Sequence, residues 1–160
     1  MKYKFNKNLP FGISLLRIFY AINAFLFLIT SVIFFEYLDI LIFGKAAPPI
    51  AAGLIRLILI AFPAYLVFAI SLLKKECYPL ATAYHLFFTL NGISTLFYFI
   101  NKNLGLKPFL EITLKPEYKT NYIVDLFGVS AQTYVIQTLG ILISILIIIY
   151  LSKRKGIFSN

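Results

Sequence analysis

Residues 126–152 read LFGVSAQTYVIQTLGILISILIIIYLS, which is 27 consecutive positions without Asp, Glu, Lys or Arg. Three further uncharged stretches precede this one, at 18–35, 57–73 and 77–101, and they contain 18, 17 and 25 residues. A helix rises about 1.5 Å per residue, so 18 residues extend about 27 Å, close to the ~30 Å hydrocarbon core of a bilayer. The sequence therefore predicts an all-α membrane protein with four transmembrane helices.

The composition agrees with this prediction. Hydrophobic residues make up 61% of the 160 positions and charged residues 13%, where a soluble domain carries about 25% charged residues. The net charge of +9 comes from basic residues in short segments beside the uncharged stretches, which is typical of membrane topology signals and does not indicate nucleic-acid binding. Cys77 is the single cysteine, so the chain forms no intramolecular disulfide.

The segments between the uncharged stretches predict one integral membrane domain over residues 1–160. We expect transmembrane helices at about 14–36, 50–73, 77–100 and 129–151, an outer loop after the first helix and a longer extracytoplasmic loop at 101–125. Residues 74–76 read Lys-Lys-Glu and leave room only for a tight turn between the second and third helices. Such a turn makes neighbouring helices antiparallel, so the predicted architecture is an antiparallel four-helix transmembrane bundle.

Basic residues predict the orientation of this bundle. If the N-terminus is cytoplasmic, nine basic residues lie on the inner side, namely Lys2, Lys4, Lys7, Arg17, Lys74, Lys75, Lys153, Arg154 and Lys155, against six on the outer side. Cytoplasmic segments carry an excess of Lys and Arg, so we expect both termini in the cytoplasm. The bias toward Ile, Phe, Lys, Asn and Tyr is common in AT-rich prokaryotic genomes, which favours a prokaryotic plasma membrane.

Small and polar residues recur at helical spacing in the third and fourth predicted helices. Residues three or four positions apart share one helix face, so each of these two helices has a polar stripe. Close helix packing explains such stripes and is the favoured interpretation, whereas a polar cavity between the two helices is the functional one. The residues that would line this cavity are Thr82, His85, Thr89, Thr133, Gln137 and Ser144.

His85 is the single histidine. Its imidazole could accept a proton or bind a ligand, but a neutral histidine hydrogen-bonded to a neighbouring helix is the simpler explanation. No second histidine or carboxylate lies beside it in the predicted helices, so the sequence predicts no metal site and no cofactor.

Arg56 lies inside the outer end of the second predicted helix. Glu36 and Asp39 lie at the outer end of the first helix, and an Arg–carboxylate pair there would join the two helices. The alternative is that the Arg56 side chain extends alone to the lipid headgroups.

Asn23 and Asn91 lie in mid-helix, each on the face opposite the small residues of its helix. An amide facing lipid without a partner is unfavourable, so we expect another helix or a second copy of the chain to cover it. These two residues are the candidate oligomer contacts.

The sequence contains no H-E-x-x-H, G-x-S-x-G or Walker motif. Three functional classes follow. The first, which we favour, is a structural or accessory subunit without catalytic activity, with the bilayer and either a second copy or another membrane protein as its partners. The second is a small oligomeric transporter or channel with a polar path between the third and fourth helices. The third is an intramembrane enzyme that uses His85.

Overall fold

The computed structural model describes residues 9–33, 40–102 and 133–158, and the chain is predominantly helical within them. Four long helices confirm the four helical segments expected from the sequence, and the helix ends that lie within the described residues differ from the expected ones by at most three residues. The predicted loop at 101–125 lies outside the described residues beyond Lys102. In chain order the elements are α1 (Phe11–Ile33), β1 (Leu41–Ile42), β2 (Lys45–Ala46), α2 (Pro49–Ser71), α3 (Cys77–Asn101), α6 (Thr133–Lys153) and the 3-10 helix η3 (Lys155–Ile157).

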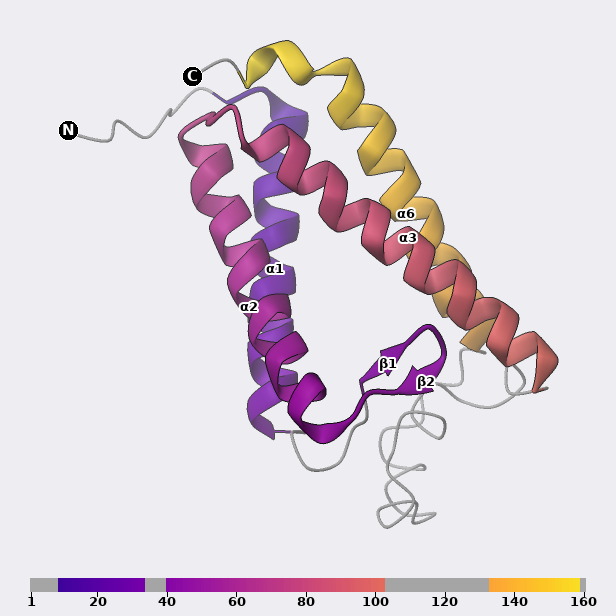
Figure 1. Ribbon diagram of the computed structural model, residues 1–160. Helices are drawn as coiled ribbons and strands as arrows, with labels where there is room; N and C mark the ends of the chain where they lie inside the picture. Colours follow the sequence, from indigo (N-terminus) through magenta and orange to yellow (C-terminus); the bar gives the residue numbers. More distant parts are fainter. Residues whose placement is uncertain (1–8, 34–39, 103–132, 159–160) are drawn as a thin grey trace.

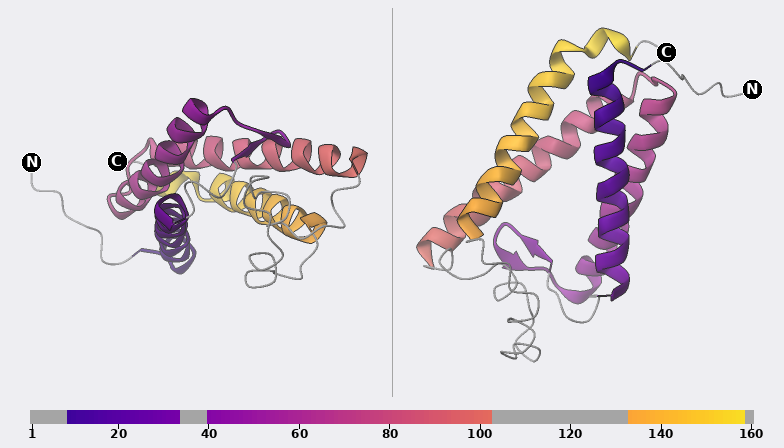
Figure 2. Two further views of the ribbon diagram at one scale, coloured as in Figure 1. Left: turned by 90° about the horizontal axis from the view of Figure 1, so that it is seen from below. Right: turned by 180° about the vertical axis from the view of Figure 1, so that it is seen from behind.

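The four helices form two pairs rather than an evenly packed bundle. Helix α1 packs along α2, and α3 packs along α6, while the chain runs alternately up and down through the four helices (Figure 1). The two pairs meet at one end of the molecule and diverge toward the other (Figure 1 and Figure 2). This divergence was not expected from the sequence, and it opens space between the pairs.

An apolar core holds the pairs together at the end where they meet. Each helix contributes side chains that are fully buried: Ile13 from α1, Ile70 from α2, Cys77 from α3 and Leu151 from α6. Phe158, which follows α6, closes this cluster at 5% exposure. Burial of one such large apolar side chain contributes about 1.5–3 kcal/mol, so the closed end of the molecule has an ordinary hydrophobic core.

The short turn between α2 and α3 fixes the closed end. Leu73 adopts a positive φ of 51°, which reverses the chain, and the Lys74 amide donates to the carbonyl of Ala69 at 3.1 Å. Glu76 follows the turn, where its carboxylate accepts a hydrogen bond from the Tyr65 hydroxyl at 3.3 Å and lies 3.7 Å from the Lys74 ammonium group. Its own backbone N–H, and then the Lys74 charge, lower the pKa of the Glu76 carboxyl group.

A small β-hairpin lies between the diverging pairs, where the sequence predicted only a loop (Figure 2). Strand β1 pairs with β2 in antiparallel register, and Phe43 and Gly44 form the two-residue turn with φ values of 51° and 81°. Positive φ at both positions is typical of hairpin turns and favours glycine at the second. A Cβ atom on Gly44 would lie 2.5 Å from the Cβ of Tyr98 in α3, so glycine also allows the hairpin to contact α3 closely.

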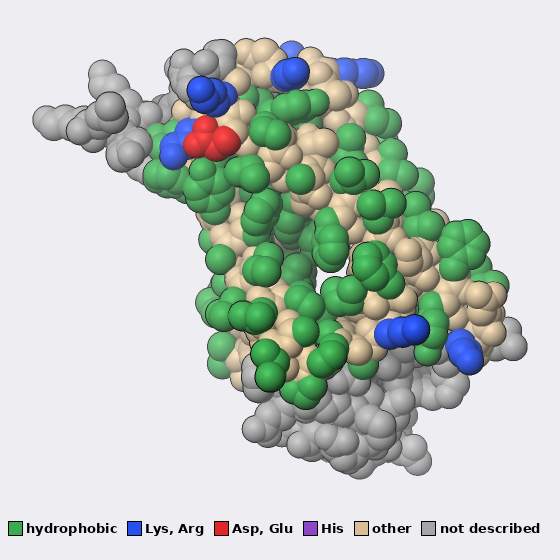
Figure 3. Space-filling model, viewed as in Figure 1, with side chains coloured by type: hydrophobic (Ala, Val, Ile, Leu, Met, Phe, Trp, Pro, Cys, Tyr) green, Lys and Arg blue, Asp and Glu red, His purple; other side chains and the backbone are tan. Residues whose placement is uncertain are grey.

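The outer faces of the helices are apolar. Phe11–Val32 and Pro49–Ser71 are each long and apolar enough to cross a membrane, judged by length and composition. The space-filling view shows hydrophobic side chains over most of the visible face, with Lys and Arg gathered at its two ends (Figure 3). The same view shows the molecule hollowed between the helix pairs.

Candidate functional site

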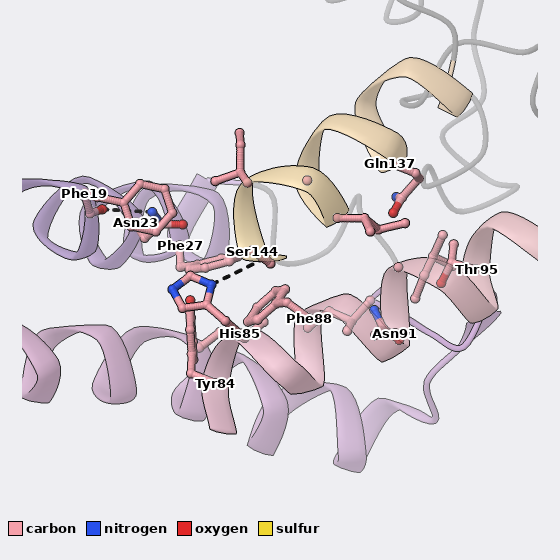
Figure 4. A pocket seen from close by; sticks show the side chains of 17 residues that line it. Phe19, Asn23, Phe27, Tyr84, His85, Phe88, Asn91, Thr95, Gln137 and Ser144 are labelled. Carbon is pink, nitrogen blue, oxygen red and sulfur yellow. Dashed lines mark hydrogen bonds between the residues drawn. The ribbon is translucent and has the colours of Figure 1, made fainter. Parts of the chain in front are cut away.

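A pocket of about 470 Å³ lies in the space between the two helix pairs. Its wall combines side chains from α1, β1, α2, α3 and α6, so every long element contributes to it (Figure 4). The aromatic rings of Phe19, Phe27, Tyr84 and Phe88 form part of the wall. Its polar lining residues are Asn23, His85, Asn91, Thr95, Gln137 and Ser144.

His85 lies at the boundary between this pocket and the apolar core. Its side chain is 2% exposed, and its Nε2 atom lies 2.8 Å from the hydroxyl of Tyr20 in α1. Its Nδ1 atom lies 3.4 Å from the hydroxyl of Ser144 in α6. In either neutral tautomer one ring nitrogen donates and the other accepts, so both contacts can be made at once. His85 therefore connects the α1/α2 pair to the α3/α6 pair.

The structure places three of the six predicted cavity residues on the wall of the pocket: His85, Gln137 and Ser144. Thr89 is buried, and its hydroxyl donates to the backbone carbonyl of His85 at 2.8 Å. The Thr82 hydroxyl is also buried, with no hydrogen-bond partner in the described part of the chain. The side chain of Thr133 lies outside the described residues.

Helix α3 packs closely against α6 at Gly92. Gly92 of α3 is buried, and a Cβ atom on it would lie 2.8 Å from Cγ1 of Ile141 in α6. This contact explains why the third helix has glycine within its polar stripe, since any side chain there would separate the two helices.

Asn23 and Asn91, the candidate oligomer contacts, both line the pocket. The Asn23 amide donates to the carbonyl of Phe19 at 2.8 Å, and the Asn91 side-chain oxygen accepts from the Phe43 N–H at 2.7 Å. Both amides thus have a partner within the chain, and a contact with a second copy stays a prediction.

The structure describes only the Arg56 side of the predicted ion pair. Arg56 lies in α2 and is partly exposed, while Glu36 and Asp39 fall outside the described residues. Pairing and extension to the headgroups therefore both stay predictions.

Tyr20 and Thr95 were not predicted as site residues from the sequence. Tyr20 is fully buried and bonds His85, but it lies one residue beside the small-residue stripe of the first helix. Its position along the helix was the available indication, because Tyr20 and His85 lie at similar distances from the closed end. Thr95 is 1% exposed and lines the pocket, and it follows Asn91 by four residues, which places both on one ridge of α3.

A second, apolar groove adjoins the pocket. It has a volume of about 380 Å³ and runs between α1 and α6. Phe19 and Ile143 line both the pocket and the groove, so the two spaces share a wall. The remaining lining residues of the groove are Gly12, Leu15, Leu16, Leu146, Ile147 and Tyr150.

The described wall of the pocket carries no formally charged side chain. None of the lining residues within the described ranges is Asp, Glu, Lys or Arg, and the ionisable side chains among them are Tyr84 and His85. Within the described ranges no three His, Cys, Asp or Glu side chains cluster as a metal site would require. The distance of 3.4 Å between Ser144 and His85 is long for a hydrogen bond. The arrangement suits hydrogen bonding to an uncharged group better than nucleophilic catalysis.

Comparisons of this chain with protein-family models, with curated proteins and with solved structures found no match.

Proposed function

We propose that this chain is a small four-pass integral membrane protein of a prokaryotic plasma membrane, with both termini in the cytoplasm. In this proposal it acts as a non-catalytic accessory subunit that binds a second copy or another membrane protein. The observation that carries the proposal is the apolar outer surface of the helices.

A core helix of a soluble protein is mostly buried, but only 17% of the apolar window in α1 and 22% of that in α2 are buried. Helices α3 and α6 also expose large apolar side chains, among them Phe97, Leu139 and Leu146 at 63%, 53% and 65%. Soluble monomers rarely expose contiguous apolar surface on this scale. Lipid chains or partner helices would remove this apolar surface from water.

The exposed charges support a transmembrane orientation. Lys75, Lys153, Arg154 and Lys155 are near the closed end, and Lys45 and Lys102 lie toward the open end, between which the helix surface is apolar. Charged groups at both ends of an apolar band match the two headgroup regions of a bilayer.

Thiol labelling tests membrane insertion and topology. In a Cys77→Ala background, we expect Lys102→Cys to react with a membrane-impermeant maleimide on intact cells. Lys75→Cys should react only after permeabilisation, because the proposal places it in the cytoplasm. The protein should also stay in the membrane pellet after extraction at alkaline pH. Release from the pellet, or labelling of Lys75→Cys on intact cells, would contradict the proposal.

A transporter or channel is the second candidate, and the neutral polar wall of the pocket favours it. Water in a transport path would reach the side chain at position 137, which lines the pocket. In the same cysteine-free background a transporter therefore requires Gln137→Cys to react with a water-soluble thiol reagent. Two controls should not react: Thr89→Cys, because the position is buried, and Thr138→Cys, because the exposed side chain would face lipid. An unreactive Gln137→Cys would remove this candidate.

A further inference from the structure

The apolar groove between α1 and α6 leads to basic residues at the closed end of the molecule. Its α6 wall includes Ile143, Leu146 and Tyr150, which share one face of the helix because they recur at intervals of three or four residues. The next positions in this series are Lys153, the last residue of α6, and Arg154, and both are exposed. The face of α6 that forms the groove is therefore apolar along its length and positively charged where the helix ends.

The groove is narrow and open along its side. It extends over residues 12–19 of α1 and 143–150 of α6, which is about 10 Å along each helix. Leu16 lines it at 6% exposure, whereas Leu15 and Leu146 are 56% and 65% exposed. Helix α1 begins at the closed end and α6 ends there (Figure 1). In the membrane orientation proposed above, the side of the groove faces lipid chains and its charged end lies at the inner headgroups.

Tyr150 places a hydroxyl group between the apolar part of the groove and its charged end. A Cβ atom on Gly12 would overlap the Tyr150 hydroxyl oxygen, so this hydroxyl lies directly on the α1 backbone. Lys153 follows Tyr150 by about one helical turn. From the closed end inward the groove therefore presents cations, one hydroxyl and an apolar channel. A phospholipid presents its phosphate, its ester groups and its acyl chains in the same order.

The charges at the end of the groove favour an anionic occupant. Glu76 is the one acidic residue within the described ranges, and its carboxylate lies 3.7 Å from the Lys74 ammonium group. Lys153 and Arg154 thus have no carboxylate partner among the described residues, and a phosphate group would pair with them. A second copy of the chain in the same orientation would bring the same basic residues to this end, so repulsion between like charges disfavours it as the occupant.

We propose that the groove between α1 and α6 binds an anionic phospholipid of the inner leaflet. Its phosphate pairs with Lys153 and Arg154, its ester region meets the Tyr150 hydroxyl, and one acyl chain lies along the groove. The proposal rests on the membrane orientation proposed above, because the bilayer supplies the lipid. It adds a lipid ligand to an accessory role that concerns a protein partner.

Photolabelling of the full chain in phosphatidylcholine nanodiscs tests this proposal. Two probes carry the same diazirine acyl chain, one on phosphatidylglycerol and one on phosphatidylcholine, and labelled peptides are mapped by mass spectrometry. We expect saturable labelling of residues 12–19 and 143–150 by the phosphatidylglycerol probe. At equal mole fraction this labelling should exceed that by the phosphatidylcholine probe about tenfold, a headgroup preference of the size that two basic residues at an anionic headgroup provide. Glycerol 3-phosphate, which lacks acyl chains, should not compete.

Two double variants with the same change in charge provide the decisive comparison. Lys153→Gln/Arg154→Gln should abolish the headgroup preference. Lys75→Gln/Lys155→Gln removes two charges at the same end and should keep it, because Lys75 lies in the turn between α2 and α3 and the Lys155 ammonium group lies 5.6 Å from the centre of the Tyr78 ring in α3. All four substituted side chains are exposed, so both variants should fold.

The outcomes separate the two proposals. Labelling confined to other helices, equal labelling by the two probes, or an unchanged preference in Lys153→Gln/Arg154→Gln would each overturn the lipid site in well-inserted protein and leave the membrane proposal standing. Equal loss of preference in both double variants would also overturn it, because the overall charge of the closed end would then explain the preference. Failure of the alkaline-extraction and maleimide tests would instead overturn the membrane proposal itself.

Discussion

Gly92→Leu should destabilise the fold by about 2 kcal/mol, because the new side chain would push α3 away from α6. The first atom of the new side chain would lie 2.8 Å from Cγ1 of Ile141, which belongs to a branched side chain held in the interface. Overpacking on this scale costs about 3 kcal/mol. The higher helix propensity of leucine returns about 0.8 kcal/mol. The free energy of unfolding is measured by SDS titration in mixed micelles.

The same substitution at two other helical glycines is the control. Gly53 and Gly140 have open space beside the Cα atom, so leucine there should raise stability by a few tenths of a kcal/mol up to about 0.8 kcal/mol. Ile141→Ala in the Gly92→Leu background should restore part of the loss by making room for the new side chain. If all three leucine variants change stability equally, the close contact of α3 with α6 is wrong.

The positions of the helices follow from the sequence, but their arrangement does not. Absence of charge over 17 to 27 residues leaves few alternatives to a long apolar helix, which is why all four helices were predicted. The hairpin lies where the two pairs diverge (Figure 2), and it contains the turn at Phe43 and Gly44 and contacts Tyr98 of α3. Such contacts join segments about 50 residues apart, and single-sequence periodicity carries no information about them.

The candidate site, like the fold, could be predicted only in part. Helical spacing identified His85, Gln137 and Ser144 because they lie on the facing stripes of α3 and α6, and all three line the pocket. Asn23 and Asn91 were expected to be covered by another helix or by a second copy of the chain, because each lies opposite the small residues of its helix. Where helix pairs diverge, however, a wider arc of each helix faces the space between them, and both asparagines fall within that arc. Helical spacing predicts on which face of its helix a residue lies, whereas the angle between packed helices decides what covers that face.

Tyr20→Phe should destabilise the fold by about 2 kcal/mol, since it leaves the Nε2 atom of a histidine that is 2% exposed without its partner at 2.8 Å. His85→Leu should cost about 3 kcal/mol, because Tyr20 and Ser144 are buried at 0% and 6% exposure and the hydroxyl of each loses a partner. Tyr84→Phe is the matched control. Its ring contacts His85, but no hydrogen bond joins its hydroxyl to the described residues, so its loss should change stability by less than about 0.5 kcal/mol.

The double variant Tyr20→Phe/His85→Leu distinguishes a hydrogen bond from simple packing. Removing both partners leaves no unpaired group between them, so the double variant should be less destabilised than the sum of the single variants by at least about 1 kcal/mol. Packing alone predicts losses that add. Because this bond joins α1 to α3, it acts between the two helix pairs at the edge of the pocket. Strict additivity would mean that the apolar core alone holds the pairs together, and that His85 contributes only to the lining of the pocket.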